Sequence, residues 1–564
     1  MLEGLMQHEF QLTVPRVLER MRGVNGEREV VTLTEDGTVR ASYAEVAARV
    51  DRLCRALDSL GVEDGDRVGT FAWNSQQHLE LYMAVPSAGA VLHTLNIRLF
   101  PEQLTYVVNH AQDRVVFVDA SLVPVLEKLA PSLETVRHYV VIGEGSTGSL
   151  PNAVRYEELL SAQEPGYEYP DLDERQAAAL CYTSGTTGNP KGVLYSHRST
   201  VLHALAECMA DSIGLRSSDR VLPVVPMFHA NAWGLPYSCA LVGADLVMPG
   251  RFLAAEPLAE LIESERVTLA GAVPTIWIDL LRHVDERRCD LSSLRMVICG
   301  GAAVPRSLME GFEQRHGVRV LQGWGMTEMS PLGAVARPPA TAEGEDHWAY
   351  RTTAGRLVPL VEARLIDDEG SEVAWDGEST GELQVRGPWI ASGYYEDPGG
   401  TEKFDGGWLR TGDIAAIDRG GFVRITDRAK DVIKSGGEWI SSVELENELM
   451  GHGEVLEAAV IATPDERWSE RPLACVVLVE GASCTAEELR EHLEPRVARW
   501  WIPEQFAFLD EIPKTSVGKF DKKVLRSRLA EGELSERTVV AAADAPNRSE
   551  QTRTDTRTRR VTLG

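Results

Sequence analysis

Short apolar runs alternate with amphipathic helical stretches along the chain up to about Val361, and this order limits the architectures that the chain can adopt. The first long helical stretch has a clear start, because Ser42 and Glu45 form the pattern of a capping box and one apolar face continues from there to Gly61. Such alternation is typical of an α/β domain with largely parallel strands. The apolar runs include RVVFVDA (114–120), HYVVIG (138–143), LRMVICGG (294–301) and VRVLQGWG (318–325).

The pattern changes twice in the remaining sequence. After Val361 it consists of strands and turns, as in a small β-rich subdomain, and after Arg428 it becomes a compact α+β pattern. A chain of 564 residues is too long for one hydrophobic core. We therefore predict an N-terminal domain over 1–429 and a C-terminal domain over 430–536. The polar, repetitive residues 537–564 are predicted to be a disordered tail.

The composition excludes several classes of protein. A formal net charge of −28 argues against binding to nucleic acid, which favours basic surfaces. Eight cysteines show no C-x-x-C pair and no metal-ligand spacing, which is typical of reduced thiols in a cytosolic protein. The chain begins without the pattern of a signal peptide, and prolines and polar residues interrupt its most apolar region (221–248). We expect a cytoplasmic protein with no transmembrane segment.

A glycine-rich loop follows one of the buried apolar runs. The run AAALC (177–181) predicts a strand, and YTSGTTGNPKG (182–192) predicts the loop that leaves it. The loop combines three glycines and four Ser or Thr hydroxyls with Lys191, all of which suit an anion. It differs from the common pattern G-x-x-x-x-G-K-[ST], because Asn189 and Pro190 follow the second glycine. An ordinary surface turn seldom combines so many anion-binding groups, so we interpret the segment as a phosphate loop.

Three further segments suit other parts of a nucleotide. In QGWGMTE (322–328), Trp324 offers a flat face for a purine, and the carboxylate of Glu328 can face a phosphate only with Mg²⁺ between them. The glycines of CGGA (299–302) permit a close approach to an adenine, and Asp413 of LRTGD (409–413) can accept hydrogen bonds from a ribose. Gly323 and Gly325 are predicted to permit a tight turn, and LRTGD is predicted to place Asp413 after a turn. Each segment alone also fits an ordinary turn.

Two segments near the C-terminal region carry lysines. The segment DRAKDVIKSGGEWISS (427–442) lies at the boundary between two compositional blocks, where a charged solvated linker and a functional hinge are compatible interpretations. The segment PKTSVGKF (513–520) places Lys519 on an irregular loop, where a single lysine is usually an exposed residue without a specific role.

Together, and in this order, the segments resemble the adenylate-forming superfamily, which includes acyl- and aryl-CoA synthetases, peptide-synthetase adenylation domains and luciferases. The resemblance covers about residues 30–530. The stretches VVPMFHANAWGLPY (224–237) and KSGGEWISS (434–442) look most like medium- and long-chain fatty-acyl-CoA synthetases. The resemblance implies an α/β fold, with a large N-terminal adenylate-forming domain of several subdomains and a small, mobile α+β C-terminal domain. Similar long-chain enzymes suggest a homodimer.

The resemblance also implies an activity and a set of site residues. Members of the family join a carboxylic acid, here a fatty acid, to ATP and then transfer the acyl group from acyl-AMP to CoA. Mg²⁺ is the expected cofactor, held by Thr183 and Glu328. The positions that match the family's ATP-binding residues are Thr183, Ser184, Gly185, Thr186, Thr187, Gly188, Lys191, Gly301, Ala302, Gln322, Gly323, Trp324, Thr327, Asp413, Arg428, Lys430 and Lys434. The catalytic positions are Glu328, the hinge residue Lys430 and Lys519, which matches the lysine between the acid and the α-phosphate. The substrate positions are His229, Ala230, Trp233 and Trp439.

Several alternatives stay open at this level. Trp324 stands where the family often has Tyr, and either ring can stack on adenine. Trp233 matches the gate of the fatty-acid tunnel in long-chain enzymes, but it also fits a core tryptophan. An amino-acid-loading adenylation domain is disfavoured, because no acid occurs between Arg220 and Asp245 to hold a substrate ammonium. An aryl (cinnamate-like) acid–CoA ligase, a carrier-protein thiol as acceptor, and a non-catalytic binding protein on the same fold remain the other hypotheses.

Overall fold

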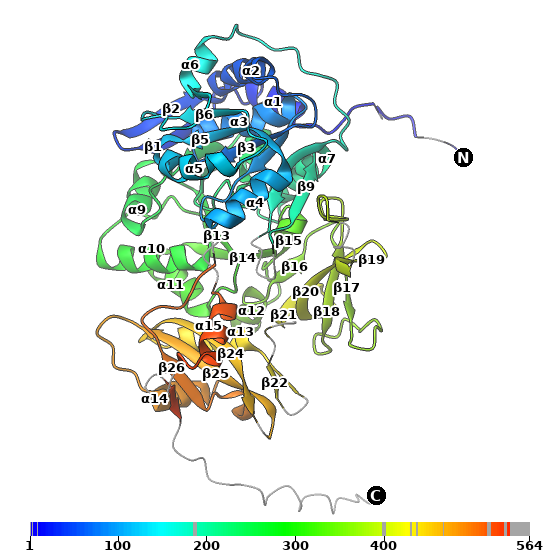
Figure 1. The fold of residues 1–564 in the computed structure, drawn as a ribbon. Coiled ribbons are helices and arrows are strands. Elements are labelled where there is room, and N and C mark those ends of the chain that lie inside the picture. Colours follow the sequence, from blue (N-terminus) through cyan, green and yellow to red (C-terminus); the bar gives the residue numbers. More distant parts are fainter. Residues whose placement is uncertain are drawn as a thin grey trace, which may run out of the picture. The chain divides into compact units, whose positions relative to one another are not determined.

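The computed structural model describes residues 2, 4–7, 9–183, 189–397, 402–428, 431, 433–435, 438–465, 467–515, 520–534 and 539–541 (Figure 1). The chain divides into two compact units. Unit 1 comprises Met1–Val432 and Pro513–Lys523, and unit 2 comprises Ile433–Ile512 and Val524–Gly564. The predicted α/β class, with a large N-terminal and a small C-terminal domain, is confirmed. The predicted boundary between residues 429 and 430 stays a prediction.

Unit 1 contains a seven-stranded sheet that is parallel except at one edge. Alternate residues of β5 face opposite cores: Val115 and Phe117 pack with α2 and α3, whereas Val116 and Val118 pack with α4 and α5. Helices thus cover both faces, as a parallel sheet requires. The strands, in sheet order, are β7 (Ala153–Arg155), β6 (His138–Ile142), β5 (Asp113–Asp119), β3 (Arg67–Phe71), β4 (Val91–Thr94), β8 (Ala177–Tyr182) and the antiparallel β9 (Gly192–Ser196).

A second sheet of unit 1 has fourteen strands among the described residues. The parallel strands of this sheet continue into the strands of the β-rich segment through β15, which pairs antiparallel with β14. The order is β17 (Glu362–Ile366), β18 (Gly381–Arg386), β20 (Trp408–Ile417), β21 (Phe422–Arg428), β16 (Gly355–Leu357), β15 (Leu332–Val335), β14 (Arg319–Gly325), β13 (Met296–Gly300), β12 (Leu269–Ala272), β10 (Arg220–Pro223), β11 (Asp245–Met248), β1 (Glu29–Thr34) and β2 (Gly37–Ser42), with β19 (Phe404–Asp405) beside β20.

The two faces of this second sheet pack into different hydrophobic cores. Val297 and Cys299 of β13 pack with α9, α10 and α11, which lie together in green in Figure 1. Met296 and Ile298 face the core that the two sheets share. The helices are α1 (Val14–Arg22), α2 (Tyr43–Ser59), α3 (Gln76–Ser87), α4 (Pro101–Ala111), α5 (Val123–Leu129), α6 (Tyr156–Ser161), α7 (His197–Cys208), α8 (Leu235–Val242), α9 (Ala255–Ser264), α10 (Pro274–Glu286), α11 (Arg306–His316) and α12 (Gly344–Arg351).

Unit 2 is a six-stranded sheet with helices that share its core. Phe506 of β26 and Leu489 of α14 lie fully buried in that core. The strands are β23 (Glu438–Ile440), β22 (Ile433–Ser435), β25 (Ser469–Leu478), β26 (Gln505–Phe508), β27 (Val539–Ala541) and β24 (Val455–Asp465). The helices are α13 (Ser442–Met450), α14 (Ala486–Leu493) and α15 (Lys522–Ala530), and α15 begins within unit 1.

The structure differs from the sequence predictions at three places. Gly323 and Gly325 lie within β14 rather than in a turn, because Gly325 lets the backbone of Pro331 approach to where a Cβ atom would stand. Asp413 lies within β20 rather than after a turn. Residues Val539–Ala541 of the predicted tail form β27, which adds an antiparallel edge to β26. Two β-branched valines favour that extended backbone.

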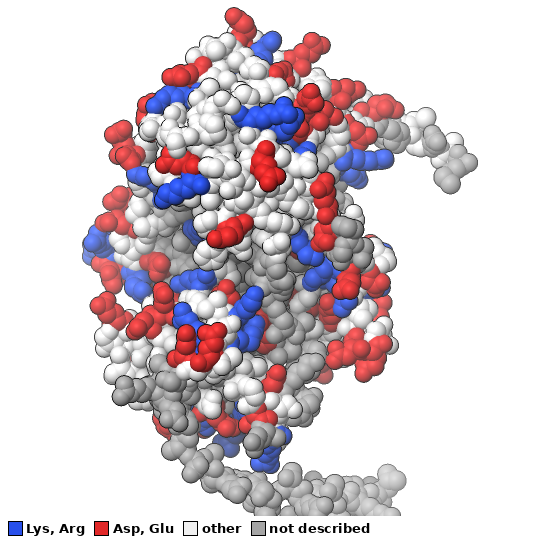
Figure 2. All heavy atoms as spheres, in the orientation of Figure 1, with Lys and Arg blue, Asp and Glu red and all other residues white. Residues whose placement is uncertain are grey.

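The capping box at Ser42 and Glu45 is present at the start of α2, so that prediction is confirmed. Among the described residues, the structure contains no helix that is both long and apolar enough to cross a membrane. On the face drawn in Figure 2, Lys and Arg are interspersed with Asp and Glu over the described surface rather than gathered into one basic patch.

Candidate active site

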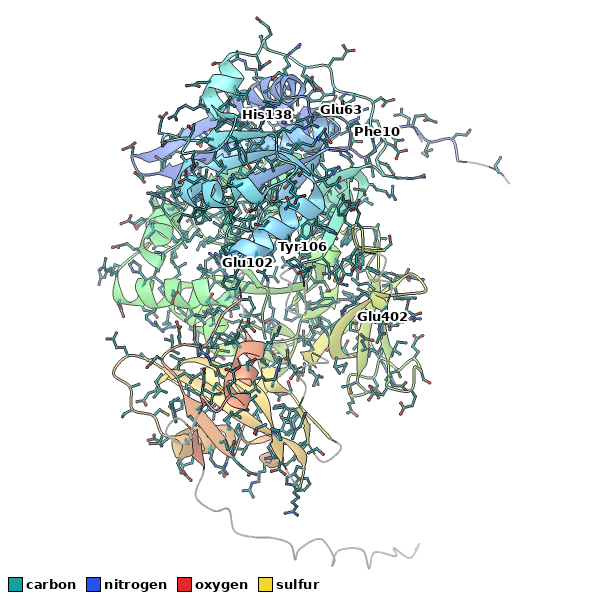
Figure 3. The ribbon with its side chains drawn as sticks, viewed as in Figure 1. Phe10, Glu63, Glu102, Tyr106, His138 and Glu402 are labelled. Carbon is teal, nitrogen blue, oxygen red and sulfur yellow. The ribbon has the colours of Figure 1, made fainter. Side chains whose placement is uncertain are left out.

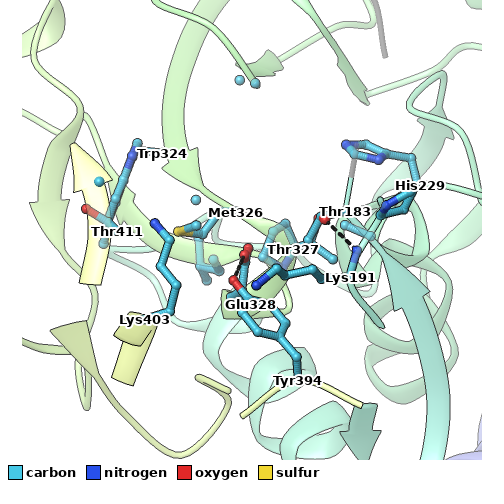
Figure 4. Close-up of a pocket in the computed structure, with 18 of the residues that line it drawn as sticks. Thr183, Lys191, His229, Trp324, Met326, Thr327, Glu328, Tyr394, Lys403 and Thr411 are labelled. Carbon is cyan, nitrogen blue, oxygen red and sulfur yellow. Dashed lines mark hydrogen bonds between the residues drawn. The ribbon is translucent and has the colours of Figure 1, made fainter. Parts of the chain in front are cut away.

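Unit 1 contains a cavity of about 1030 Å³, at the ends of strands from both sheets (Figure 4). Thr183 follows β8, Gly301 follows β13, and Gly323 and Trp324 belong to the last residues of β14. β8 is parallel to β4, and β13 is parallel to β14, and the carboxyl ends of parallel strands are where α/β proteins bind ligands. The β-rich segment supplies another part of the lining, including Thr411 and Gly412 of β20.

The two ends of the predicted phosphate loop are tied together. The Thr183 N–H donates to Lys191 O at 2.9 Å, and the Lys191 N–H donates to Thr183 Oγ1 at 3.1 Å (Figure 4). Lys191 Nζ lies 2.9 Å from Asp397 Oδ2 and 4.8 Å from the centre of the Tyr394 ring. Its ammonium group is therefore held at the cavity, where an anion can compete with Asp397. The loop residues 184–188, which include Ser184, Gly185, Thr186, Thr187 and Gly188, lie outside the described residues.

Glu328 is a buried acid at the wall of the cavity, with 6% of its surface exposed. It lies on the short turn after β14, where the Ala391 N–H donates to its backbone oxygen at 2.7 Å. The Tyr394 hydroxyl donates to Glu328 Oε1 at 2.7 Å (Figure 4). Burial, and then the charge of Glu328, raise the pKa of Tyr394, so the phenol stays protonated and keeps donating. The neighbouring Thr327 accepts a hydrogen bond from Tyr195 at its backbone oxygen.

Trp324 and Asp413 are brought together from different parts of the second sheet. The indole Nε1–H of Trp324 donates to Asp413 Oδ2 at 3.1 Å, and Asp413 is only 2% exposed. The Asp413 N–H also donates to Thr411 Oγ1. Asp413 lies opposite Arg428 in the register of β20 and β21. An indole face next to an oriented carboxylate is suited to a base and a ribose.

The predicted adenine positions divide into two kinds. Gly301 and Gly323 line the cavity. Gln322 instead uses its side chain within the protein: its Oε1 accepts from the Val304 N–H and its Nε2–H donates to Thr353 O. These bonds hold the backbone beside the cavity, so the amide of Gln322 supports the wall rather than facing a ligand. Ala302 is exposed and is not part of the cavity lining.

His229, Ala230 and Trp233 line the cavity on a turn with an unusual backbone. Ala230 has φ 41° and Trp233 has φ 56°, with the two residues between them also left-handed. Such values are costly for residues other than glycine and are often found where side chains must be aimed at a site. The Trp233 ring lies against Gly271 and Gly300, where an added Cβ atom would stand 3.7 Å and 3.6 Å from it. The indole therefore packs directly beside the backbones of β12 and β13.

Several residues of the predicted site, or their side chains, lie outside the part of the chain that the structure describes. Lys430 and Lys519 lie outside the described residues, as do the side chains of Arg428, Lys434 and Trp439. The segment that contains Lys519 belongs to unit 1 through Pro513–Lys523, and its described residues Thr515 and Phe520 line the cavity.

The cavity also has lining residues that the sequence did not single out. Tyr394 and Asp397 come after β18, in a stretch without a recognisable motif. Tyr106 of α4 and Glu402, which precedes β19, also line the cavity and are labelled in Figure 3. Glu207 of α7 also lines the cavity. No local pattern marks these residues, because their contacts join segments far apart in the chain.

Comparison with known proteins identifies the family of the chain. The model of the AMP-binding enzyme family matches residues 19–395, and that of the AMP-binding enzyme C-terminal domain matches residues 444–519. The chain therefore belongs to the AMP-binding enzyme family, and it is an AMP-forming acid–thiol ligase of the adenylate-forming superfamily.

Three relatives are similar over nearly their whole length. The chain is 47% identical to a long-chain-fatty-acid–CoA ligase of Thermus thermophilus, over 91% of this chain and 94% of that one. It is 45% identical to a 3-methylmercaptopropionyl-CoA ligase of Ruegeria lacuscaerulensis, over 91% and 97%. It is 44% identical to a medium-chain-fatty-acid–CoA ligase of Ectopseudomonas oleovorans, over 94% and 97%.

A solved structure shares the fold. The anthranilate CoA ligase AuaEII in complex with anthranoyl-AMP has a TM-score of 0.84 and 28% identity, covering 92% of this chain and 98% of that one.

Proposed function

We propose that the protein activates a medium- or long-chain fatty acid with ATP to acyl-AMP and then transfers the acyl group to CoA. The observation that carries this proposal is the 1030 Å³ cavity of unit 1, whose lining includes a phosphate-loop lysine, the buried Glu328, Trp324 with its hydrogen bond to Asp413, and the Trp233 turn. The similarity to two fatty-acid–CoA ligases supports the choice of acid.

The chemistry demands such a cavity. A carboxylate must attack the α-phosphorus of ATP, so pyrophosphate leaves only if the negative charge is neutralised and the reactants are aligned. Lys191 supplies positive charge beside the loop, and Trp324 with Asp413 would fix the base and the ribose. In the second step the thiol of CoA attacks the acyl carbon, and AMP leaves. Neither step needs a nucleophilic side chain of the protein. We assign to Lys519 the stabilisation of the first step, and to Lys430 the hinge between the two steps.

Mg²⁺ fits the residues at the phosphate end. Glu328 offers a carboxylate and Thr183 a hydroxyl, and both line the cavity. Mg²⁺ prefers oxygen ligands and commonly takes only one or two from the protein while phosphates and water complete its octahedron. Consistent with that habit, the described residues contain no cluster of three or more His, Cys, Asp or Glu that could hold a metal alone. When bound, the ion would neutralise phosphate charge.

A panel of acids tests the proposal. Acid-dependent pyrophosphate release should be fastest with a fatty acid among acetate, octanoate, palmitate, cinnamate, anthranilate and 3-methylmercaptopropionate. Preference for an aryl acid, or for 3-methylmercaptopropionate, would replace the fatty-acid assignment and leave the ligase reaction in place. Omitting CoA and adding a carrier-protein thiol would identify the acceptor.

Trp233 can be tested in the same assay. Because its ring lies between the glycine backbones and the cavity, Trp233→Ala should enlarge the acyl part and shift the preference from octanoate toward palmitate. The affinity for ATP should change less than the ratio between acids. Unchanged ratios at normal thermal stability would make Trp233 a core residue. Trp277→Phe is a control for the loss of a buried indole, since Trp277 packs in the other core.

A further inference from the structure

Glu207 is a buried acid in the lining of the cavity. It is 1% exposed and lies at the end of α7, and the lining also includes the apolar side chains of Ile213, Ile298 and Val335. Within the described part of the chain, no Lys or Arg pairs with it. A charged carboxylate in such a place is costly unless it is paired. We therefore expect the Glu207 carboxyl group to be protonated, or to have a functional role that offsets the cost of its burial.

The hydrogen bonds around Glu207 show where its proton lies. Ser238 Oγ is within hydrogen-bond distance of Glu207 Oε2 and, at 3.1 Å, of Gly234 O. One hydroxyl has one proton, and Gly234 O can only accept. Both contacts are satisfied together when the Glu207 carboxyl is protonated and donates to Ser238, which in turn donates to Gly234 O. Burial acts in the same direction and raises the pKa of Glu207 to about 8.

The histidine one turn earlier on the same helix does not supply a counter-charge. His203, one turn earlier on α7, is 2% exposed, and burial lowers its pKa to about 3. The Leu332 N–H donates to its Nε2 at 3.2 Å, so the neutral ring carries its proton on Nδ1. Burial raises the pKa of the Cys208 and Cys239 thiols, so they are neutral as well.

The second carboxyl oxygen of Glu207, Oε1, is the atom that a ligand can contact. With Oε2 bonded to Ser238, Oε1 is the carbonyl oxygen of a neutral acid, and it makes no hydrogen bond to any described residue. An acceptor that is buried among apolar side chains is satisfied only by a donor that enters the cavity. A saturated hydrocarbon tail has no donor, whereas a tail that ends in a hydroxyl group has one.

We propose that Glu207 accepts a hydrogen bond from a terminal hydroxyl of the acyl chain, so that the preferred substrate is an ω-hydroxy fatty acid. The proposal rests on the acid–CoA ligase function and refines its substrate. The aliphatic part of the chain would contact Ile213, Ile298 and Val335, and its hydroxyl would reach Glu207. The reaction that supplies such a substrate must hydroxylate the terminal carbon of a fatty acid.

The test compares acids of equal length that differ only at the tail. Specificity constants for pyrophosphate release are measured for 6-hydroxyhexanoate against heptanoate and for 10-hydroxydecanoate against undecanoate. The wild-type protein should favour the hydroxy acid of at least one pair by roughly 10- to 100-fold, because the methyl tail leaves a buried acceptor unpaired. Equal rates, or a preference for the methyl tail in both pairs, would overturn the proposal. A preference for 6-aminohexanoate over both would also overturn it, since an ammonium requires an ionised Glu207.

Two substitutions locate the effect at Glu207. Glu207→Gln keeps an oxygen that faces the cavity and an N–H that can donate to Ser238, so the preference for the hydroxy acid should survive. Glu207→Leu removes the acceptor at similar volume and should reverse the preference. Glu207→Met replaces the leucine variant if that variant does not fold in a thermal melt. An unchanged ratio in a folded apolar variant would contradict the proposal, whereas a protein that activates no acid at all would contradict the ligase function instead.

Discussion

The hydrogen bond between Trp324 and Asp413 makes a quantitative prediction about ATP. Asp413 is almost fully buried, and the indole N–H of Trp324 donates to its Oδ2 at 3.1 Å. Trp324→Phe keeps an aromatic face but removes that donor. A hydrogen bond to a charged group contributes about 1.5–3 kcal/mol, and water can partly replace the indole because Trp324 is half-buried, so we expect the lower end. A loss of about 1.4 kcal/mol corresponds to a roughly 10-fold weaker affinity for ATP.

Isothermal titration with a non-hydrolysable ATP analogue measures this change. The affinity should fall roughly 10-fold in Trp324→Phe, while the Michaelis constant for the acid changes little. Trp348→Phe is the matched control, because Trp348 packs against Arg306 and Arg351 and does not line the cavity. An ATP affinity within about twofold of wild type in a folded Trp324 variant would refute the role of this pair.

The other groups of the site give four further predictions. Glu328→Ala should lose most activity with every acid, and EDTA should abolish wild-type turnover; near-normal rates in EDTA would remove the Mg²⁺ assignment. Lys519→Ala should slow acid-dependent pyrophosphate exchange roughly 10²- to 10³-fold and spare thioester formation from supplied acyl-AMP. Lys430→Pro should show the reverse pattern, because proline fixes a backbone torsion, and equal losses in both half-reactions would argue against a hinge. Burial raises the pKa of Glu207 to about 8, so the unfolded chain releases this proton at lower pH and the stability contributed by Glu207 falls as the pH rises toward 8. Glu207→Gln should therefore gain melting temperature relative to wild type between roughly pH 5 and pH 8, and a constant difference would contradict the buried, protonated state.

Local signals predicted the elements of the fold well. The capping box at Ser42 and Glu45 starts α2, and the one at Thr485 and Glu488 starts α14. These patterns depend on contacts within one helical turn, which the sequence contains completely. The two glycines of QGWGMTE were less informative, because Gly325 is required by a close approach of Pro331 inside a sheet rather than by a turn. A glycine in a sequence indicates either an unusual backbone torsion or a close approach by another atom, but it does not indicate which of the two applies.

The site was predictable only where one segment carries the chemistry. Thr183 and Lys191 are neighbours across one loop, so their joint place at the cavity follows from that loop. Tyr394 reaches Glu328 across 66 residues of sequence, and no periodicity connects the two. Glu207 resembles any polar residue of an amphipathic helix until Ser238 and the apolar lining around it are known.

Transfer of an oxygen atom from the acid to AMP tests whether the acid is activated as an acyl-adenylate. The acid is labelled with oxygen-18 in its carboxyl group and incubated with the protein, ATP and CoA, and the AMP is analysed by mass spectrometry. If the carboxylate attacks the α-phosphorus, one labelled oxygen stays in AMP when the thioester forms. The account predicts AMP with one oxygen-18 atom and unlabelled pyrophosphate. Unlabelled AMP, or ADP with labelled phosphate, would contradict an acyl-adenylate formed in this cavity.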